Sequence, residues 1–306
     1  MRRSRYKYVI SIVVLAAVYL LGGYSDRHEL FPFSAIHRAR AFFISKEPGR
    51  FSVDEVGRLA SDVEKLQTDC PRQTPRTAVL LIIGQSNAGN HAGQGFRSAH
   101  EGKVANFYRG SCSVAESPLL GADGTQGEYW TELGNLLIEA GAFDSVMLAP
   151  AAITGSEVSR WAKGGNLNDS MTDTATQLQR SGYQVTHVLW VQGEINYVIG
   201  TSEKDYRDRF MSLVESLRSV GVSAPIYVSV ASKCLGKSNG GTNTHSLDNP
   251  VSRAQKSLPN IGVGLKQGVD SDVLLDRLDR YDECHFSATG EQKVAKAWAG
   301  LLSNNP

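Results

Sequence analysis

The sequence lacks a surplus of charge of either sign, because 32 basic and 31 acidic residues leave a formal net charge of +1. Nucleic-acid binding needs a basic field, so no nucleic-acid partner is expected. No repeat with a period of about 20 to 50 residues is visible, which argues against solenoids and propellers. The chain has 306 residues, 41% of them hydrophobic and 21% charged, which fits one large globular domain with an N-terminal extension.

Cysteine is scarce, and its spacing does not fit a zinc site. The four cysteines include no C-x-x-C pair, so no metal site is expected. An even number fits disulfides in an exported protein, and four cysteines allow three pairings. From their order along the chain we favour Cys70–Cys112 and Cys234–Cys284. Four free buried thiols are the alternative.

The one long uncharged apolar run lies at the N-terminus. Basic residues at positions 2, 3, 5 and 7 precede about 17 residues, Tyr8 to Tyr24, that carry no charge, close to the lower length limit of a bilayer span. The basic flank predicts that this end stays in the cytoplasm and that the rest lies outside, most simply in a bacterial periplasm. The run ends at Gly22 and Gly23 without an A-x-A pattern, so an uncleaved transmembrane anchor is favoured over a cleaved signal segment of a secreted protein.

Residues 25–75 are predicted to form a stalk between this anchor (1–24) and the main domain (76–306). Ser52 and Glu55 have the spacing of a capping box, which favours a helix start. Apolar residues then recur at steps of three and four, which predicts one amphipathic helix: Val53, Val56, Leu59, Ala60, Val63 and Leu66. A partly ordered spacer is the alternative.

From residue 78 onward, short apolar runs alternate with helical patterns. The runs 78–83, 145–148, 185–191 and 226–230 fit strands buried on both faces. Helical patterns lie near 131–141, 170–181, 203–219 and 287–302. This alternation predicts a parallel sheet with helices on both faces, a flavodoxin-like three-layer α/β/α sandwich. The functional site of such a sheet lies at the carboxyl ends of its strands.

Two motifs place a serine, a histidine and an aspartate near this edge. Ser86 lies in Gly84-Gln85-Ser86-Asn87, directly after the first buried run. A serine is a weak nucleophile and needs a base such as His285, which in turn needs an acid such as Asp282 three residues earlier. Each motif alone also fits a simpler role. Ser86 could be an ordinary turn serine, and the segment around Asp282 and His285 could only cap the last helix, for which Ser287 has the right position.

Two further motifs place polar groups at other strand ends. The segment 190–196 ends a strongly apolar run and carries Gln192, whose side-chain amide suits an oxyanion. Its simpler role is a helix start with Glu194 in the first turn. Gly155 offers a backbone N–H that no Cβ blocks. Trp161 and Trp190 fit either flat faces for a sugar ring or core side chains.

Together and in this order, the motifs resemble the SGNH hydrolase superfamily, and more closely its sialate O-acetylesterase and acetylxylan esterase branch. That branch has G-Q-S-N, G-G-[ST]-S-x-x-x-W, W-x-Q-G-E-x-D and D-x-x-H-F-S, matched here at 84–87, 154–161, 190–196 and 282–287. The resemblance covers roughly residues 76 to 303. Thr154 stands for a motif glycine, Asn196 for the closing aspartate and Glu157 for a common serine, which bears on substrate preference more than on reaction type.

The resemblance implies the SGNH hydrolase fold and a catalytic triad of Ser86, His285 and Asp282. It implies an oxyanion hole made by the N–H groups of Ser86 and Gly155 and the amide of Gln192. The residues that it implies in substrate contact or in support of the site are Gln85, Asn87, Glu194, Asn196 and Trp161. The implied activity is a carbohydrate O-acetylesterase that forms an acetyl-serine and needs no metal or cofactor.

Two other functions stay open at this point. A polysaccharide O-acetyltransferase would pass the same acetyl group to a sugar hydroxyl instead of water. A non-catalytic carbohydrate-binding protein would need no intact triad. A protease or lipase is disfavoured because the G-x-S-x-G elbow is missing. The expected partners are an acetylated carbohydrate and, through the anchor, a membrane, whereas protein partners are unknown from the sequence.

Overall fold

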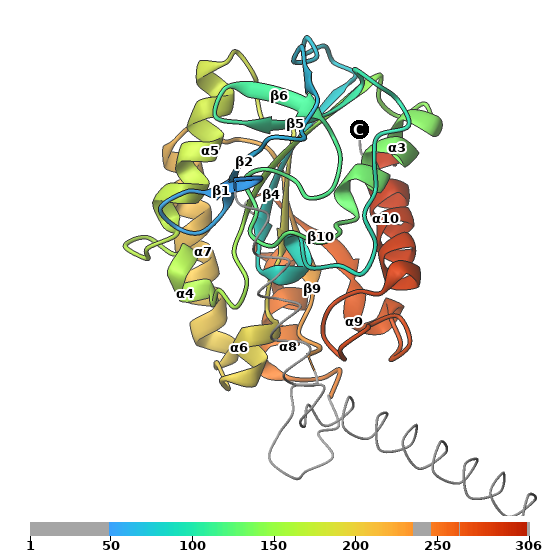
Figure 1. The fold of residues 1–306 in the computed structure, drawn as a ribbon. Coiled ribbons are helices and arrows are strands. Elements are labelled where there is room, and N and C mark those ends of the chain that lie inside the picture. Colours follow the sequence, from blue (N-terminus) through green and yellow to red (C-terminus); the bar gives the residue numbers. More distant parts are fainter. Residues whose placement is uncertain (1–48, 235–245, 263, 305–306) are drawn as a thin grey trace, which may run out of the picture. The chain divides into compact units, whose positions relative to one another are not determined.

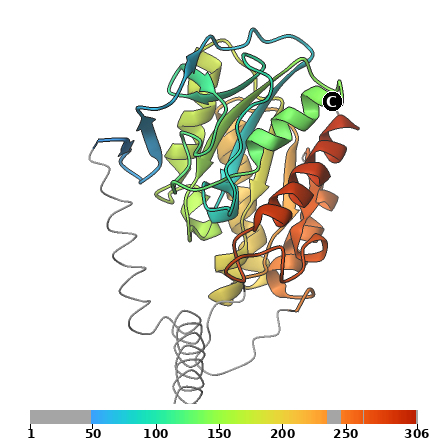
Figure 2. The same ribbon diagram turned by 45° about the vertical axis from the view of Figure 1, so that its right-hand side comes forward.

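Within residues 49–234, 246–262 and 264–304, which the computed structural model describes, one sheet of eight strands separates two layers of helices (Figures 1 and 2). The strand order is β10-β9-β8-β4-β7-β5-β6-β3. The strands are β3 (Gln67–Thr68), β4 (Thr77–Gly84), β5 (Val104–Tyr108), β6 (Ser111–Val114), β7 (Ser145–Ala152), β8 (His187–Val191), β9 (Ile226–Val230) and β10 (Leu265–Asp270).

Helices cover both faces of this sheet. On one face lie α3 (Trp130–Glu139) and α10 (Ala288–Ser303), and on the other lie α4 (Val158–Trp161), α5 (Asn168–Arg180), α7 (Glu203–Ser219) and α8 (Pro250–Ser257), as Figure 1 shows. Short helices occupy connections: η1 (Ser86–Ala88), α6 (Glu194–Val198), η2 (Leu258–Ile261) and α9 (Ser271–Leu274). The predicted three-layer arrangement is therefore confirmed for the described residues.

The central strand β4 is the reason that the two layers hold together. All eight of its residues are buried, as expected for a continuous apolar run in a parallel sheet. Leu80 and Ile82 pack with the core of α3 and α10, whereas Leu81 and Ile83 pack with the core of α5 and α7. Each buried side chain of this size contributes about 1.5–3 kcal/mol. The strand thereby fixes its own carboxyl end, where the first motif begins.

The helix boundaries follow from capping groups that the sequence contains. The Ser202 hydroxyl accepts a hydrogen bond from the N–H of Asp205 at the start of α7, and Ser287 does the same for Gly290 at the start of α10. Both side chains satisfy backbone donors that a helix start leaves unpaired. The predicted helix at 203–219 matches α7, and the cap role of Ser287 is confirmed.

The sheet is mixed, which corrects the prediction of a wholly parallel sheet. Six strands run parallel, from β10 through β5, whereas β6 and β3 are antiparallel. The cause is the two-residue connection between β5 and β6. Arg109 and Gly110 both have positive φ, at 49° and 84°, which is typical of the tight turns that join antiparallel strands.

The predicted amphipathic helix between residues 52 and 66 is wrong. This segment forms a two-stranded antiparallel sheet, β1 (Phe51–Val53) and β2 (Leu59–Asp62). Asp54 accepts from the N–H groups of Val56 and Arg58, and Gly57 has φ +93°, so the chain turns where a helix would continue. The supposed apolar stripe does not form one buried face, since Leu59 is buried at 2% exposure whereas Val53 and Val63 are 62% and 74% exposed. The three- and four-residue spacing of the apolar residues therefore does not reflect a helix here. Residues 51–75 belong to the same compact unit as the sheet.

Both predicted disulfides are present. Cys70 pairs with Cys112 of β6, and Cys234 pairs with Cys284. The predicted anchor, residues 8–24, lies outside the described residues. Among the residues that are described, no helix is long and apolar enough to cross a membrane.

Glu291, in the first turn of α10, gives a testable effect of pH on stability. Burial raises the pKa of Glu291 to about 8, although the N–H of Gln94 donates to its carboxyl group at 2.8 Å. In the folded protein Glu291 therefore stays protonated up to about pH 8, whereas in the unfolded chain it loses its proton near pH 4.5. The free energy of unfolding should fall by about 1.4 kcal/mol per pH unit between these two values because of this group.

Glu291→Gln should remove this dependence. Urea titrations are expected to give the variant a higher free energy of unfolding than the wild type at pH 8.5 and a similar one at pH 4. Parallel pH dependence in both proteins would contradict the assignment.

Candidate active site

The candidate site begins where β4 ends in a sharp turn. Gly84 has φ +155°, and a Cβ at this position would lie 1.9 Å from the carbonyl oxygen of Val191 in β8. Only glycine tolerates both this conformation and this approach. Since the turn follows directly, Ser86 is presented at the carboxyl edge of the sheet as the sequence predicts.

Ser86 starts the short helix η1 and is 3% exposed. The His285 ring is bonded through Nδ1 to Asp282, and no hydrogen bond joins it to the Ser86 hydroxyl in the described structure. Catalytic hydrogen bonds are often long before substrate binds and tighten in the complex. The serine is therefore placed at the site but not yet engaged.

His285 and Asp282 form a tight pair on the loop before α10. The Nδ1 atom of His285 lies 2.6 Å from Oδ2 of Asp282, and the His285 N–H donates to Oδ1 at 2.7 Å. Burial alone would raise the pKa of Asp282, but the hydrogen bonds from the ring and backbone of His285 outweigh it and lower that pKa below its usual 3.8. The carboxylate stays ionised and orients the imidazole.

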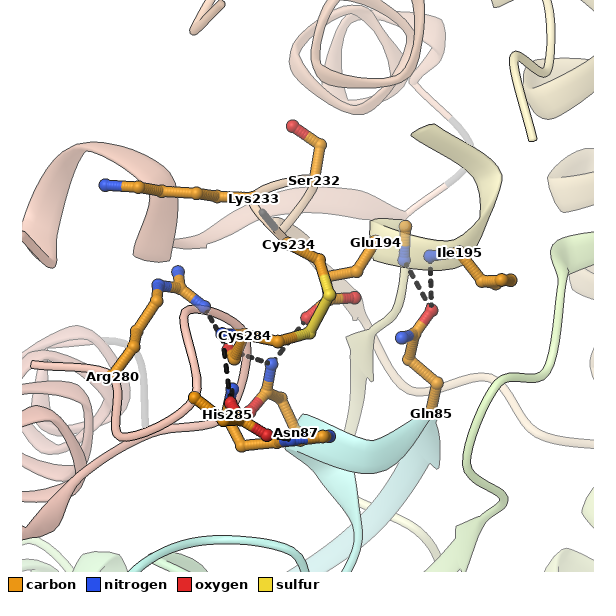
Figure 3. Close-up of a disulfide and its surroundings, with 12 residues drawn as sticks. Gln85, Asn87, Glu194, Ile195, Ser232, Lys233, Cys234, Arg280, Cys284 and His285 are labelled. Carbon is orange, nitrogen blue, oxygen red and sulfur yellow. Dashed lines mark hydrogen bonds and ion pairs between the residues drawn. A yellow bond between two sulfur atoms is a disulfide. The ribbon is translucent and has the colours of Figure 1, made fainter. Parts of the chain in front are cut away.

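Asn87 connects the serine turn to the histidine loop (Figure 3). Its Nδ2 donates to the carbonyl oxygen of Cys284 at 3.3 Å and to Oε1 of Glu194 at 2.7 Å. The buried Arg280 donates to the same Cys284 carbonyl at 2.5 Å. The residues next to Ser86 and next to His285 are thus joined, which brings the two motifs together across 197 residues.

Gln85 holds the third motif against the serine turn (Figure 3). Its Oε1 accepts hydrogen bonds from the N–H groups of Gly193 and Ile195 at 3.4 and 3.2 Å. Gln85 and Asn87 are almost fully buried. Their hydrogen bonds support the turn, in agreement with one of the two roles that the resemblance implies for them.

Gln192, which is predicted to donate to an oxyanion, makes its hydrogen bonds within the protein among the described residues. It is fully buried, and its Nε2 points at the Ser156 carbonyl (3.0 Å) and at Oδ1 of Asn196 (2.5 Å). Both amide hydrogens are therefore occupied. Buried polar groups are normally hydrogen-bonded within the protein. Through its bond to the Ser156 carbonyl, Gln192 supports the loop that carries Gly155.

Asn196 and the tryptophans are also supporting side chains. Asn196 is buried, accepts from the N–H of Val158 at 2.9 Å and donates to Thr201. Trp161 and Trp190 are fully buried and pack edge to face, so of the two roles that the sequence leaves open the structure shows the core role. Trp161 instead donates to the Ser156 hydroxyl at 2.9 Å.

Glu194 is a buried carboxyl group in the first turn of α6. Burial raises its pKa above the usual 4.5, although Asn87 donates to it and Arg280 lies nearby. Its Oε2 has no hydrogen-bond partner in the described part of the chain. The buried side chain holds Asn87, which agrees with a supporting role.

The Gly155 loop reaches the serine turn through Gly84. The N–H of Ile153 donates to the Gly84 carbonyl at 3.0 Å. Gly155 itself is exposed, has φ +61°, and a Cβ there would meet no atom within 4 Å. Its backbone therefore lies open beside the strand ends, as an oxyanion donor must.

Sequence reasoning missed three residues beside His285. The rings of His91 and Tyr281 stack on the His285 ring, with centroids 5.7 and 5.9 Å away, and His91 contacts Asp123. His91 and Asp123 are 32 residues apart and share no spacing signal. In the described ranges no three His, Cys, Asp or Glu side chains gather as metal ligands would.

The disulfide beside the site gives a prediction with a built-in control. Cys284 precedes His285, and Cys234 follows β9, so this bridge anchors the histidine loop (Figure 3). Cys70–Cys112 closes a similar length of chain at the far edge of the sheet. Each pair of Cys→Ala changes should lower the free energy of unfolding by about 3–4 kcal/mol.

Only the Cys234→Ala/Cys284→Ala variant should also lose turnover, by about 10- to 100-fold, because small displacements of a catalytic group are costly. Urea titration and kcat, measured on both variants, check this. Equal kcat in the two variants would contradict a positioning role for Cys234–Cys284.

Comparisons with known proteins identify the family and support the fold. A family model described as carbohydrate esterase, sialic acid-specific acetylesterase, matches residues 76–303. A protein from Arabidopsis thaliana superposes with a TM-score of 0.55 at 16% identity, over 76% of this chain and 99% of that one, and shares the fold.

Two other solved structures are less similar. A carbohydrate acetylesterase from Xanthomonas citri gives a TM-score of 0.47 at 15% identity over 74% of this chain. A peptidoglycan O-acetylesterase gives 0.37 at 19% identity over 52% of this chain. This chain spans 56% and 47% of those two proteins. No curated protein matches the sequence.

Proposed function

Since the chain belongs to the carbohydrate esterase family of sialic acid-specific acetylesterases and is therefore a carboxylic ester hydrolase, we propose that it removes O-acetyl groups from a glycan through an acetyl-serine on Ser86. The observation that carries this proposal is the His285–Asp282 pair, tied through Asn87 to the serine turn. A nucleophile needs an oriented base, and these contacts supply one.

The first half of the reaction forms the acetyl-serine. His285 accepts the proton of the Ser86 hydroxyl while Oγ attacks the acetyl carbonyl carbon. The N–H groups of Ser86 and Gly155 stabilise the oxyanion, without the amide of Gln192. The bond between the carbonyl carbon and the sugar oxygen then breaks, and His285 returns the proton to that oxygen.

The second half repeats these steps with water. His285 accepts a proton from water, whose oxygen attacks the acetyl carbonyl carbon. The bond to Ser86 breaks, Oγ takes the proton from His285, and acetate leaves. Asp282 stabilises the imidazolium in both halves. These steps use side chains and backbone of this chain alone.

We also propose that the domain works outside the cytoplasm. Two disulfides support this, because such bonds persist in oxidising compartments. An anchor formed by residues 8–24, which lie outside the described residues, would keep it at a membrane.

The test is acetate release by the full chain with both disulfides intact. p-Nitrophenyl acetate reports any esterase activity, and O-acetylated xylan, sialic acid and peptidoglycan report the glycan. Acid-quenched enzyme should carry an acetyl group on the Ser86 peptide in mass spectrometry. A folded protein that releases no acetate and does not react with a fluorophosphonate would overturn the proposal, whereas acetyl transfer to an added glycan without acetate release would replace hydrolysis by transfer.

A further inference from the structure

A second histidine–aspartate pair lies beside the first. Nε2 of His91 is 3.1 Å from Oδ1 of Asp123 and 2.8 Å from the hydroxyl oxygen of Thr154. The other oxygen of Asp123 accepts a hydrogen bond from the N–H of Thr154 at 2.8 Å. The Asp123 carboxylate thus holds the Thr154 backbone directly, and one nitrogen of His91 contacts both this carboxylate and the Thr154 hydroxyl.

Thr154 is the residue before Gly155, whose N–H is the proposed oxyanion donor. Gly155 has φ +61°, a Cβ there would meet no atom within 4 Å, and its N–H lies in the peptide plane that it shares with the Thr154 carbonyl group. The position of its N–H therefore depends on how the preceding residue is held. Thr154 also stands where the motif that it resembles has glycine, so the hydroxyl bond to His91 is a feature of this sequence.

The same histidine contacts the proposed base. The His91 and His285 rings are stacked at 5.7 Å between centroids, with 27° between their planes. Tyr281, which also stacks on His285, donates its hydroxyl to the carbonyl oxygen of His91 at 2.8 Å. His91 is thus in contact with both the oxyanion loop and the base.

We propose that His91 and Asp123 are positioning residues, which use Thr154 to fix the Gly155 N–H and ring packing to fix His285. This inference rests on the proposed acyl transfer through Ser86. Both fixed groups act on charge that develops only in the transition state, so loss of the contact should lower kcat and leave KM nearly unchanged.

The sharpest test removes one hydroxyl. Thr154→Val keeps the side-chain shape but deletes the bond to His91, and kcat with p-nitrophenyl acetate is expected to fall about tenfold with KM within twofold. Thr154→Ser restores the hydroxyl and should recover most of kcat. Thr176→Val on α5, which removes a threonine hydroxyl bonded within its own helix, serves as the matched control and should keep the wild-type kcat.

A double-mutant cycle separates positioning from general damage. His91→Ala removes both the Thr154 contact and the packing on His285, so it should lower kcat at least as much as Thr154→Val. The His91→Ala/Thr154→Val variant should then be little worse than His91→Ala alone, because the contact between the two residues is already broken. Multiplicative losses, an unchanged kcat, or a rise in KM alone would each overturn the positioning role. If Ser86→Ala retained wild-type turnover, the proposed acyl transfer itself would fail, which is a distinct result.

Discussion

Ser86→Ala is expected to lower kcat for acetate release by about 10⁶-fold, the scale on which loss of a catalytic serine acts in other triad enzymes. The physical reason is that alanine has no oxygen with which to attack the acetyl carbonyl carbon. The turn itself should survive, because Gln85 and Asn87 hold it through hydrogen bonds that do not involve the Ser86 side chain. Acetylation at residue 86 should vanish with the activity.

The control for this variant is Ser113→Ala. Ser113 is a buried serine on β6, and its hydroxyl has no hydrogen-bond partner in the described residues. It should retain the wild-type kcat, and thermal unfolding should show both variants folded. A folded Ser86→Ala protein with more than about a thousandth of wild-type turnover would mean that the acetyl group is carried elsewhere.

The fold was predictable wherever one segment carries its own signal. The buried run of β4 and the apolar stripe of α7 each reflect a single periodic pattern, and both elements form where that pattern predicts. The β1–β2 hairpin was missed because the turn chemistry of Asp54 and Gly57 outweighs apolar spacing. The antiparallel edge was missed because it depends on two residues with positive φ, Arg109 and Gly110.

The candidate site shows the same division between local and distant information. The pairing of Asp282 with His285 is set within three residues, so the sequence contains it. The occupation of the Gln192 amide depends on Ser156, which lies 36 residues away and belongs to another strand end. Contacts of this kind form only when the sheet assembles, so the sequence alone does not show which polar groups at the strand ends are already hydrogen-bonded within the protein.

Asp282→Asn should lower kcat by about 10⁴-fold while the loop keeps its shape. In the wild type, Oδ2 of Asp282 accepts from Nδ1 of His285 at 2.6 Å, which leaves Nε2 unprotonated and able to accept the serine proton. The asparagine oxygen can still accept from the N–H groups of Cys284 and His285, as Oδ1 does now at 3.0 and 2.7 Å. Its NH₂ group must then face Nδ1, and this arrangement favours the tautomer that cannot act as a base.

The pH dependence of stability reports the ionised Asp282 carboxylate in the wild type. Because the His285 hydrogen bonds lower the pKa of Asp282 below 3.8 despite burial, the wild-type carboxylate stays ionised above about pH 4. Its contribution to stability is present above that pH and is lost as the pH falls through the lowered value. Asp144→Asn, an exposed aspartate paired with Arg76, is the matched control and should keep the wild-type kcat. If folded Asp282→Asn retained kcat within tenfold of the wild type, another carboxylate would have to orient the base, and Asp123 beside His91 would be the first to replace in turn.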